Sequence, residues 1–266
     1  MILKIYKKII KFFNLILYII IYKPNYKFDI FLNKQEKIFE KYNLNRNRAI
    51  EKLNFIKKKY SFISNPMSSE HQLIFSAISN NKNYEVNRIL EIGTYDGINS
   101  FLLSQLFPTA KIETIDLDEG DEKFKNFYSR AKNFVSDRDK ILKKISNIFF
   151  FKKNSLNLIF DNNKYDLIWI DGAHGYPVVC VDIINSIKLI NENGIILCDD
   201  VYSNKIQNAD EMFHSHASYE TLSALKKENI IDFDLFYKRL DSETNSVEKN
   251  RKFVGIIKKN NFLSQL

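Results

Sequence analysis

The sequence has few cysteines, which excludes a disulfide-stabilised scaffold. Only two of the 266 residues are cysteines, Cys180 and Cys198, and both lie in apolar runs, where a free thiol behaves as a small hydrophobic group. This pattern is typical of a reducing compartment, so we expect a cytoplasmic protein. Glycine and proline are also scarce, with 7 and 4 residues. Lys, Asn and Ile are abundant, a composition typical of AT-rich coding, so part of the basic charge carries no functional message.

The chain also lacks a run that is long and apolar enough to predict a transmembrane helix. The main apolar run extends from Phe12 to Tyr22, which is shorter than the roughly 20 residues that cross a bilayer. No small-residue cleavage site follows this run, so a signal peptide is not expected. Internal repeats are absent as well.

Positive charge is concentrated in the first 60 residues. They contain 15 Lys or Arg and 4 Asp or Glu, a net charge of +11, whereas residues 61–266 contain 25 and 28, a net charge of −3. Lysines recur at helical spacing beside Ile5, Ile9 and Phe12. Such a helix suits the surface of an anionic membrane, which residues 1–22 would contact in a peripheral association. The alternative is that this helix packs on its own domain or on a second copy, in a homodimer.

We divide the chain into a basic amphipathic helical arm at residues 1–60 and a second domain at residues 61–266. In the second domain, strand and helix patterns alternate, which predicts an α/β fold with a mostly parallel sheet covered by helices. Strands are predicted near residues 87–93, 110–118, 147–155, 165–172 and 194–200, and residues 139–145 fit either a strand or a short helix. The last two strands, near residues 231–240 and 252–259, form an antiparallel hairpin at a sheet edge.

Polar residues and glycines follow several of the predicted strands. An open α/β sheet binds its ligand at the carboxyl ends of its strands, so these residues mark the predicted site. Gly93 and Gly97 allow a tight turn before a helix whose N-terminus can bind an anion. Their spacing is not the G-x-G-x-x-G of dinucleotide-binding proteins. Asp116 ends the second strand, where an acid can accept hydrogen bonds from both hydroxyls of a ribose.

Together these motifs resemble the class I S-adenosylmethionine-dependent methyltransferases. "EIGTYDGINS" is similar to their glycine-rich first motif and "TIDLD" to their ribose-binding acid, and the resemblance covers roughly residues 66–260. It implies a Rossmann-like sheet of seven strands and S-adenosylmethionine as the cofactor. The residues that this resemblance assigns to cofactor binding are Glu91, Gly93, Thr94, Tyr95, Gly97, Asn99, Ser100, Asp116, Asn154, Ser155 and Asp171. Asn99 and the "KKNS" segment depart from the usual pattern, in which serine and a preceding acid are common.

The segment "YDLIWIDG…GIILCDDV" is similar to one branch, the family-24-type, catechol-type and macrocin-type O-methyltransferases with their cephalosporin-hydroxylase-like relatives. In that branch, acids at the positions of Asp171, Asp199 and Asp200 hold a divalent metal ion. Two adjacent carboxylates repel each other unless a cation or water lies between them, and Mg²⁺ prefers oxygen ligands. Asp199, Asp200 and Asp171 are therefore predicted metal ligands. The alternative is a solvated loop in which Asp199 caps the following segment.

Histidines near these acids are candidate catalytic groups. His174 is three residues past Asp171, and its ordinary pKa near 6.5 suits proton removal at neutral pH. We take His174 as the candidate base, together with Asp171, although His174 also fits a supporting or an exposed loop position. His214 and His216 lack a third ligand for zinc and are candidates for acceptor contact. Trp169 lies in a predicted strand, which favours a core position.

The leading functional hypothesis is a divalent-metal-dependent O-methyltransferase, with Mg²⁺ or another divalent cation, that acts on a hydroxyl of a small molecule or glycan. The alternatives are a metal-independent methyltransferase or hydroxylase-like relative of the same fold, and a non-catalytic, membrane-associated binding protein. A nucleic acid acceptor is not expected, because residues 61–266 are slightly acidic. The Asn/Asp-Pro-Pro-aromatic motif of DNA and protein amide methyltransferases is also absent.

Overall fold

A computed structural model describes residues 13, 16, 28–63, 70–127, 133–204, 215–240 and 251–260 of the chain. The predicted membrane-contact segment at residues 1–22 lies outside these residues, apart from Phe13 and Ile16. His214 also lies outside them.

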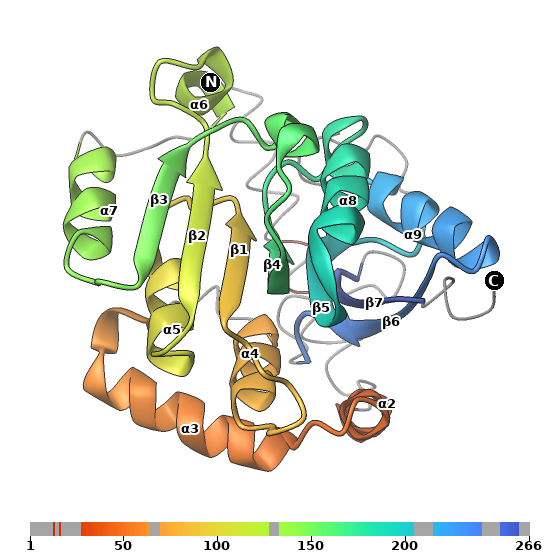
Figure 1. The fold of residues 1–266 in the computed structure, drawn as a ribbon. Coiled ribbons are helices and arrows are strands. Elements are labelled where there is room, and N and C mark those ends of the chain that lie inside the picture. Colours follow the sequence, from red (N-terminus) through yellow and green to blue (C-terminus); the bar gives the residue numbers. More distant parts are fainter. Residues whose placement is uncertain are drawn as a thin grey trace.

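A seven-stranded sheet forms the centre of the described structure (Figure 1), in the order β3-β2-β1-β4-β5-β7-β6. The first five strands pair in parallel, and β7 is antiparallel to both β5 and β6. This arrangement confirms the predicted Rossmann-like sheet. Its strands are β1 (Arg88–Ile92), β2 (Lys111–Asp116), β3 (Ile148–Lys152), β4 (Tyr165–Ile170), β5 (Ile190–Val201), β6 (Ile231–Tyr237) and β7 (Phe253–Lys259).

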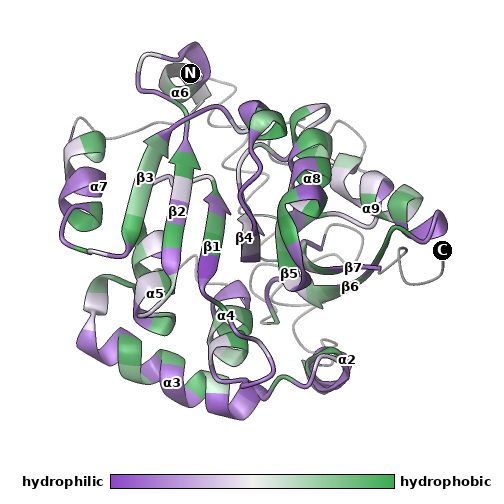
Figure 2. Cartoon of the chain, in the orientation of Figure 1, coloured by the Kyte–Doolittle hydropathy of each residue, from purple (hydrophilic) through white to green (hydrophobic). Residues whose placement is uncertain are grey.

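Side chains alternate along the strands between two hydrophobic clusters, one on each face of the sheet. In β4, Leu167 and Trp169 belong to one cluster, whereas Ile168 and Ile170 belong to the other. The period of two is what a strand requires when both of its faces are buried. Accordingly, apolar colour dominates the central strands, while the outer helices mix apolar and polar residues (Figure 2).

Helices cover both faces of the sheet (Figure 1). The face that contains Trp169 is covered by α3 (Arg46–Lys59), α4 (His71–Ser79), α5 (Ile98–Leu106) and α7 (Phe134–Leu142). The opposite face is covered by the 3₁₀ helix η4 (Ser155–Phe160), α8 (Val178–Leu189) and α9 (Ala217–Lys227). The remaining described elements are α2 (Phe28–Lys41), η3 (Ser61–Ile63) and α6 (Glu122–Phe127).

Residues 28–60, which we assigned to the arm, contribute to the core of the sheet domain. Phe39 of α2 and Leu53 and Ile56 of α3 are buried in the same cluster as Trp169. The ring of Phe39 packs edge-on against Phe236 of β6, with 4.9 Å between ring centroids. The second half of the predicted arm is therefore built into the main domain.

Two helices, α6 and α7, follow β2 in the chain, and residues 128–132 between them lie outside the described part of the chain. Residues 139–145, for which strand and helix were both open, continue α7 as far as Leu142.

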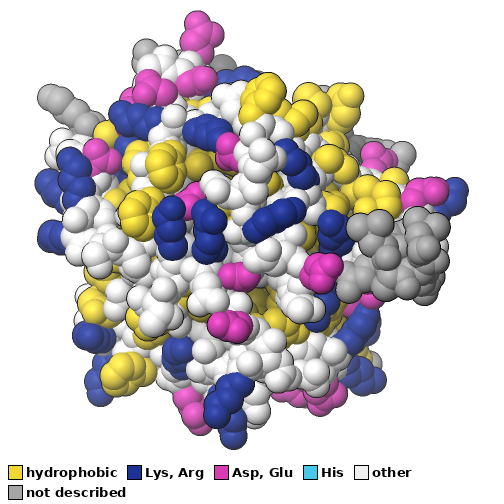
Figure 3. Space-filling model, viewed as in Figure 1, with side chains coloured by type: hydrophobic (Ala, Val, Ile, Leu, Met, Phe, Trp, Pro, Cys, Tyr) yellow, Lys and Arg dark blue, Asp and Glu magenta, His cyan; other side chains and the backbone are white. Residues whose placement is uncertain are grey.

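Among the described helices, none has the length and apolar character that crossing a bilayer requires. On the face shown in Figure 3, Lys and Arg side chains are interspersed with Asp and Glu.

Candidate active site

The register of the parallel strands places the predicted site residues in one row at the carboxyl edge of the sheet. Ile92 of β1 is aligned with Ile115 of β2 and with Ile170 of β4, and Ile170 is aligned with Cys198 of β5. The next residues along these strands are Gly93, Asp116, Asp171 and Asp199. The sheet thus brings together four residues that lie up to about one hundred positions apart in the sequence.

The loop between β1 and α5 approaches the end of β4 very closely. Gly93 has a φ of +100°, and a Cβ atom added there would lie 2.2 Å from the carbonyl oxygen of Asp171. Gly97 has a φ of +76° and precedes α5. Tyr95 between them has a φ of +48°, which is uncommon for a residue with a side chain. Positive φ angles at two glycines and one tyrosine therefore fold the loop tightly, and the missing side chains of the glycines let a ligand come close to its backbone.

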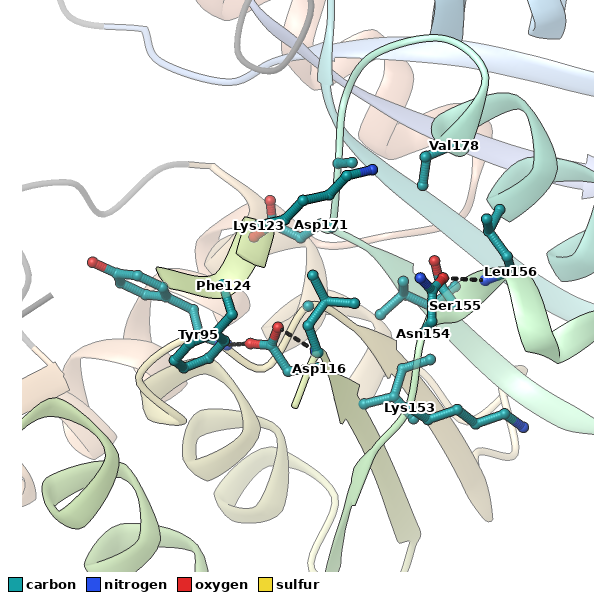
Figure 4. Close-up of a pocket in the computed structure, with 16 residues that line it drawn as sticks. Tyr95, Asp116, Lys123, Phe124, Lys153, Asn154, Ser155, Leu156, Asp171 and Val178 are labelled. Atoms are coloured by element: carbon teal, nitrogen blue, oxygen red, sulfur yellow. Dashed lines mark hydrogen bonds between the residues drawn. The ribbon is translucent and has the colours of Figure 1, made fainter. Parts of the chain in front are cut away.

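A pocket opens beside this loop (Figure 4) and is bounded by the ends of β1 and β2, the loop after β4, α6, η4 and the start of α8. Six residues assigned to the cofactor line it: Gly93, Tyr95, Asp116, Asn154, Ser155 and Asp171. The sequence analysis did not assign several other lining residues, because a lysine or an apolar residue in a loop carries no distinctive spacing. These include Leu117, Lys123, Phe124, Lys153, Leu156 and Val178.

Asp116 is held in a fixed orientation at the pocket wall. Its Oδ2 accepts a hydrogen bond from the backbone N–H of Tyr95 at 2.8 Å, and its Oδ1 accepts one from Leu117 at 2.8 Å. Each carboxylate oxygen can accept a second hydrogen bond. The geometry thus suits a ligand with two neighbouring hydroxyl groups.

Glu91 lies behind the loop and does not line the pocket. Its side chain is fully buried. It accepts hydrogen bonds from Asn99 Nδ2 at 2.7 Å, from Thr114 Oγ1 at 2.6 Å and from the hydroxyl of Ser100. Burial raises the pKa of Glu91 to about 7, although these three hydrogen bonds oppose the rise. Glu91 therefore ties the start of α5 to β1 and β2.

The other residues assigned to the cofactor support the pocket from nearby. Thr94 is buried and shares a hydrogen bond of 2.6 Å with the hydroxyl of Thr114. Asn154, which does line the pocket, accepts a hydrogen bond of 3.0 Å from the backbone N–H of Leu156 and so caps η4 (Figure 4).

The paired acids Asp199 and Asp200 are neutralised by lysines. Nζ of Lys238 lies 2.5 Å from Asp199 Oδ2 and 2.5 Å from Asp200 Oδ1. Lys252 donates to the other oxygen of Asp200. Asp200 has a φ of +51°, so the backbone turns sharply where β5 ends. Neither lysine was a predicted site residue.

The charges of this cluster are strongly coupled. Burial would lower the pKa of Lys238, but Asp199 and Asp200 raise it above its ordinary value, so the side chain remains an ammonium group. Burial would raise the pKa of Asp200, but Lys238, His174 and Lys252 hold it well below its ordinary value. Asp200 is thus a carboxylate at neutral pH.

Asp171 lies between the pocket and this cluster. Burial first, and then the negative charge of Asp199, raise its pKa well above the ordinary value. Because 35% of the side chain remains exposed, solvent limits this rise. Asp171 therefore gains a proton more readily than Asp200.

His174 faces both acids. Its Nε2 lies 3.7 Å from Asp171 Oδ1 and 3.9 Å from Asp200 Oδ2. Burial lowers the pKa of His174, and the nearby carboxylates only partly offset this effect. The imidazole is consequently neutral at pH 7, with a nitrogen that can accept a proton.

The remaining aromatic candidates lie in supporting positions. Trp169 is fully buried and stacks on His71, with 5.2 Å between ring centroids, so it belongs to the core. His216 precedes α9, and its Nδ1 lies 2.8 Å from the carbonyl oxygen of Tyr202.

The cluster does not fit the predicted metal ion. Within the described residues, no three His, Cys, Asp or Glu side chains are arranged to hold one. A lysine ammonium bridges Asp199 and Asp200 at the position where a bridging cation would bind.

Comparisons with known proteins agree with this geometry. Residues 90–201 match a family described as a methyltransferase domain. The chain is similar in fold to TomG, an O-methyltransferase from Streptomyces achromogenes involved in tomaymycin synthesis and solved with SAM. The two are 12% identical with a TM-score of 0.52, over 88% of this chain and 99% of that chain. A candidate O-methyltransferase from Klebsiella pneumoniae is 13% identical with a TM-score of 0.51, over 86% and 96%. No curated protein matches the sequence.

The sheet order and the strand-end pocket agree with the methyltransferase domain that residues 90–201 match. The resemblance found in the sequence is thereby confirmed.

Proposed function

We propose that this chain transfers the methyl group of S-adenosylmethionine to a hydroxyl oxygen of a small molecule or glycan. The observation that carries the proposal is the row of strand-end residues in which Gly93 and Asp116 line a pocket and Asp171 and His174 continue it toward a second polar cluster.

Two features of the pocket support the binding of the cofactor there. Asp116 presents both carboxylate oxygens in an orientation fixed by two backbone N–H groups, which suits the two hydroxyls of a ribose. Gly93 leaves the space that a side chain would fill, beside the carbonyl oxygen of Asp171. When bound, S-adenosylmethionine supplies an electrophilic methyl group on a sulfonium centre.

The residues beyond the pocket supply the proton chemistry. As the acceptor oxygen forms its bond to the methyl carbon and the carbon–sulfur bond breaks, the hydroxyl proton passes to Nε2 of His174. Asp171 and Asp200, at 3.7 and 3.9 Å, stabilise the imidazolium that results. Alignment of the acceptor oxygen with the methyl group supplies a large part of the rate, on the order of 7 to 11 kcal/mol.

Titration of S-adenosylhomocysteine into the purified chain tests the cofactor assignment. Replacement of Asp116 by Ala removes two charge-assisted hydrogen bonds, so affinity falls by about 10-fold or more. Asp118→Ala, an exposed acid two residues further on, is the matched control and leaves the affinity unchanged. Equal affinities for the three proteins would contradict the assignment of Asp116.

The role of His174 is tested with an acceptor found by screening hydroxylated compounds. His174→Gln lowers kcat by about 100-fold or more, because a general base contributes roughly 10²- to 10⁴-fold. Since the pKa of His174 lies below 6.5, the wild-type rate stays level as the pH falls to about 6.5 and declines only below it. An unchanged kcat in His174→Gln would exclude the base.

A further inference from the structure

We propose that Lys238, with Lys252, takes the place of a divalent cation at Asp199 and Asp200, so that the site works without a bound metal ion. The inference rests on the proposed methyl transfer for its consequence at the acceptor. Its geometric basis is independent of that function.

The position of Lys238 is that of a bridging cation. Its Nζ lies 2.5 Å from one oxygen of each acid, and its side chain is only 12% exposed. A Mg²⁺ ion shared by these two oxygens would occupy the same volume, because its oxygen ligands lie about 2.1 Å away. The ammonium group and the metal ion therefore exclude each other.

Too few oxygen atoms remain for a metal ion elsewhere in the cluster. Lys252 occupies the second oxygen of Asp200. Asp199 Oδ1 is buried and has no hydrogen-bond partner among the described residues. Besides this atom, the carboxylate oxygens that remain among the described residues of the cluster are those of Asp171, and a metal ion bound there would lie beside two ammonium groups that repel it.

The backbone holds Lys238 in place. Its N–H donates to the carbonyl oxygen of Lys252 at 3.1 Å, and its carbonyl oxygen accepts from Glu70 at 2.8 Å. The two lysines lie at the β5 end of the sheet because Phe253 is paired with both Val201 and Tyr237. Folding of the chain therefore places Lys238 between the two acids, and a metal ion would have to displace it.

The ammonium group of Lys238 can also donate a hydrogen bond to the methyl acceptor. Lys238 has three N–H donors, of which two are directed at Asp199 and Asp200. Among the described residues the third N–H has no partner, and we assign it to an acceptor oxygen, which this hydrogen bond orients for methyl transfer.

Binding of Mn²⁺, followed by electron paramagnetic resonance and calorimetry, tests the proposal. The full-length wild type shows no bound Mn²⁺ at 1 mM metal, a threshold of about 4 kcal/mol in binding free energy. Lys238→Met, which keeps the length of the side chain and removes its charge, binds one Mn²⁺, and Lys238→Met/Asp200→Asn loses it. Lys226→Met removes a lysine from a surface pair with Asp232 and behaves as the wild type.

Thermal unfolding gives a second readout. Lys238→Met leaves two adjacent buried carboxylates without their bridging cation, so its Tm falls by at least about 5 °C and 1 mM Mn²⁺ restores part of the loss. The wild-type Tm is the same in Mn²⁺ and in EDTA.

Stoichiometric Mn²⁺ binding by the wild type that Asp199→Asn abolishes would overturn the inference, as would a Lys238→Met protein that is folded but binds no metal. S-adenosylhomocysteine titration of the same samples separates the two hypotheses. Absence of cofactor binding defeats the proposed methyl transfer and leaves the metal result to decide the inference.

Discussion

At Glu91, burial and hydrogen bonding act in opposite directions on one carboxyl group. The pKa is raised from 4.5 to about 7, so the buried side chain gains a proton that the unfolded chain would have lost. A group with a raised pKa in the folded protein stabilises it fully below pH 4.5 and ceases to do so as the pH rises through about 7.

Replacement of Glu91 by Gln therefore flattens the pH dependence of stability. Between pH 4.5 and pH 8, the free energy of unfolding of the wild type falls on the order of 3 kcal/mol more than that of Glu91→Gln. The amide keeps a carbonyl oxygen for Asn99, and its NH₂ donates to the hydroxyls of Ser100 and Thr114. Urea unfolding at both pH values measures the difference, and parallel curves would contradict the raised pKa.

Gly93 allows the loop to pass beside the end of β4. An alanine there would meet the Asp171 carbonyl oxygen at 2.2 Å and would also adopt an unfavourable φ. Gly93→Ala is expected to lower the free energy of unfolding by about 3 kcal/mol or more and to weaken S-adenosylhomocysteine binding. In Gly120→Ala the added atom meets only the Asp118 side chain, so this control costs less than about 1 kcal/mol. Comparable losses in both variants would refute the explanation.

Individual site residues were predictable where a glycine or an acid follows a strand. Gly93, Asp116 and Asp171 line the pocket in the order that the strand pattern indicates. Lys238 and Lys252 were not predictable, because they lie 39 and 52 positions from the acids they contact. In the sequence, a lysine beside an apolar strand cannot be distinguished from an ordinary surface lysine.

At the scale of elements, α2 covers the exposed edge of the sheet. β6 is the outermost strand at this side of the sheet and, among the described strands, pairs only with β7. Gln35 of α2 accepts from the N–H of Tyr237 at 2.8 Å and donates to its carbonyl oxygen at 3.2 Å. One side chain thus replaces the neighbouring strand at the end of β6, next to Lys238. Covered edges resist pairing with other chains.

Gln35→Ala is expected to destabilise the domain, because it leaves the N–H and carbonyl of Tyr237 without these partners. The predicted loss is about 2 kcal/mol in the free energy of unfolding, measured by urea titration. Lys37→Ala, on the exposed side of the same helix, is the control and changes stability by less than about 0.5 kcal/mol. A similar change in the two variants would mean that α2 does not protect the edge.

The strand–helix alternation predicted the sheet because both faces of each central strand are buried and the apolar runs are correspondingly clear. The position of α2 and α3 was not predictable. Their amphipathic patterns show that one face of each helix is buried, but they do not show against which surface. In the structure, Phe39, Leu53 and Ile56 pack against the sheet domain. The same sequence pattern is equally compatible with a separate arm.

At the scale of the whole molecule, the N-terminal helices of the described core begin with α2 at residue 28. A chain that begins at residue 28 keeps every described core residue and is expected to bind S-adenosylhomocysteine within about twofold of the full chain. A chain that begins at residue 61 loses Phe39, Leu53 and Ile56 from the core and is expected not to fold, because each such loss costs roughly 2–5 kcal/mol. Circular dichroism and cofactor titration distinguish the two.

The same deletion tests the proposed membrane contact. Vesicles with anionic headgroups are expected to sediment the full chain and to leave the chain from residue 28 in solution. Retention by vesicles of both proteins would assign membrane contact to another surface, and retention of neither would refute it. Sedimentation velocity of both proteins measures whether residues 1–27 also hold a homodimer.

Because β7 lies between β5 and β6 in the sheet, the site is complete only after β7 has been synthesised. The strand that is translated last among those described is the one that joins β6 to the sheet. A ribosome that has made residues up to 250 carries a chain whose β5 has an open edge and whose acids have neither Lys252 nor the backbone that anchors Lys238. The nascent chain thus has an unpaired β5 edge and only one of the two lysines that neutralise Asp199 and Asp200.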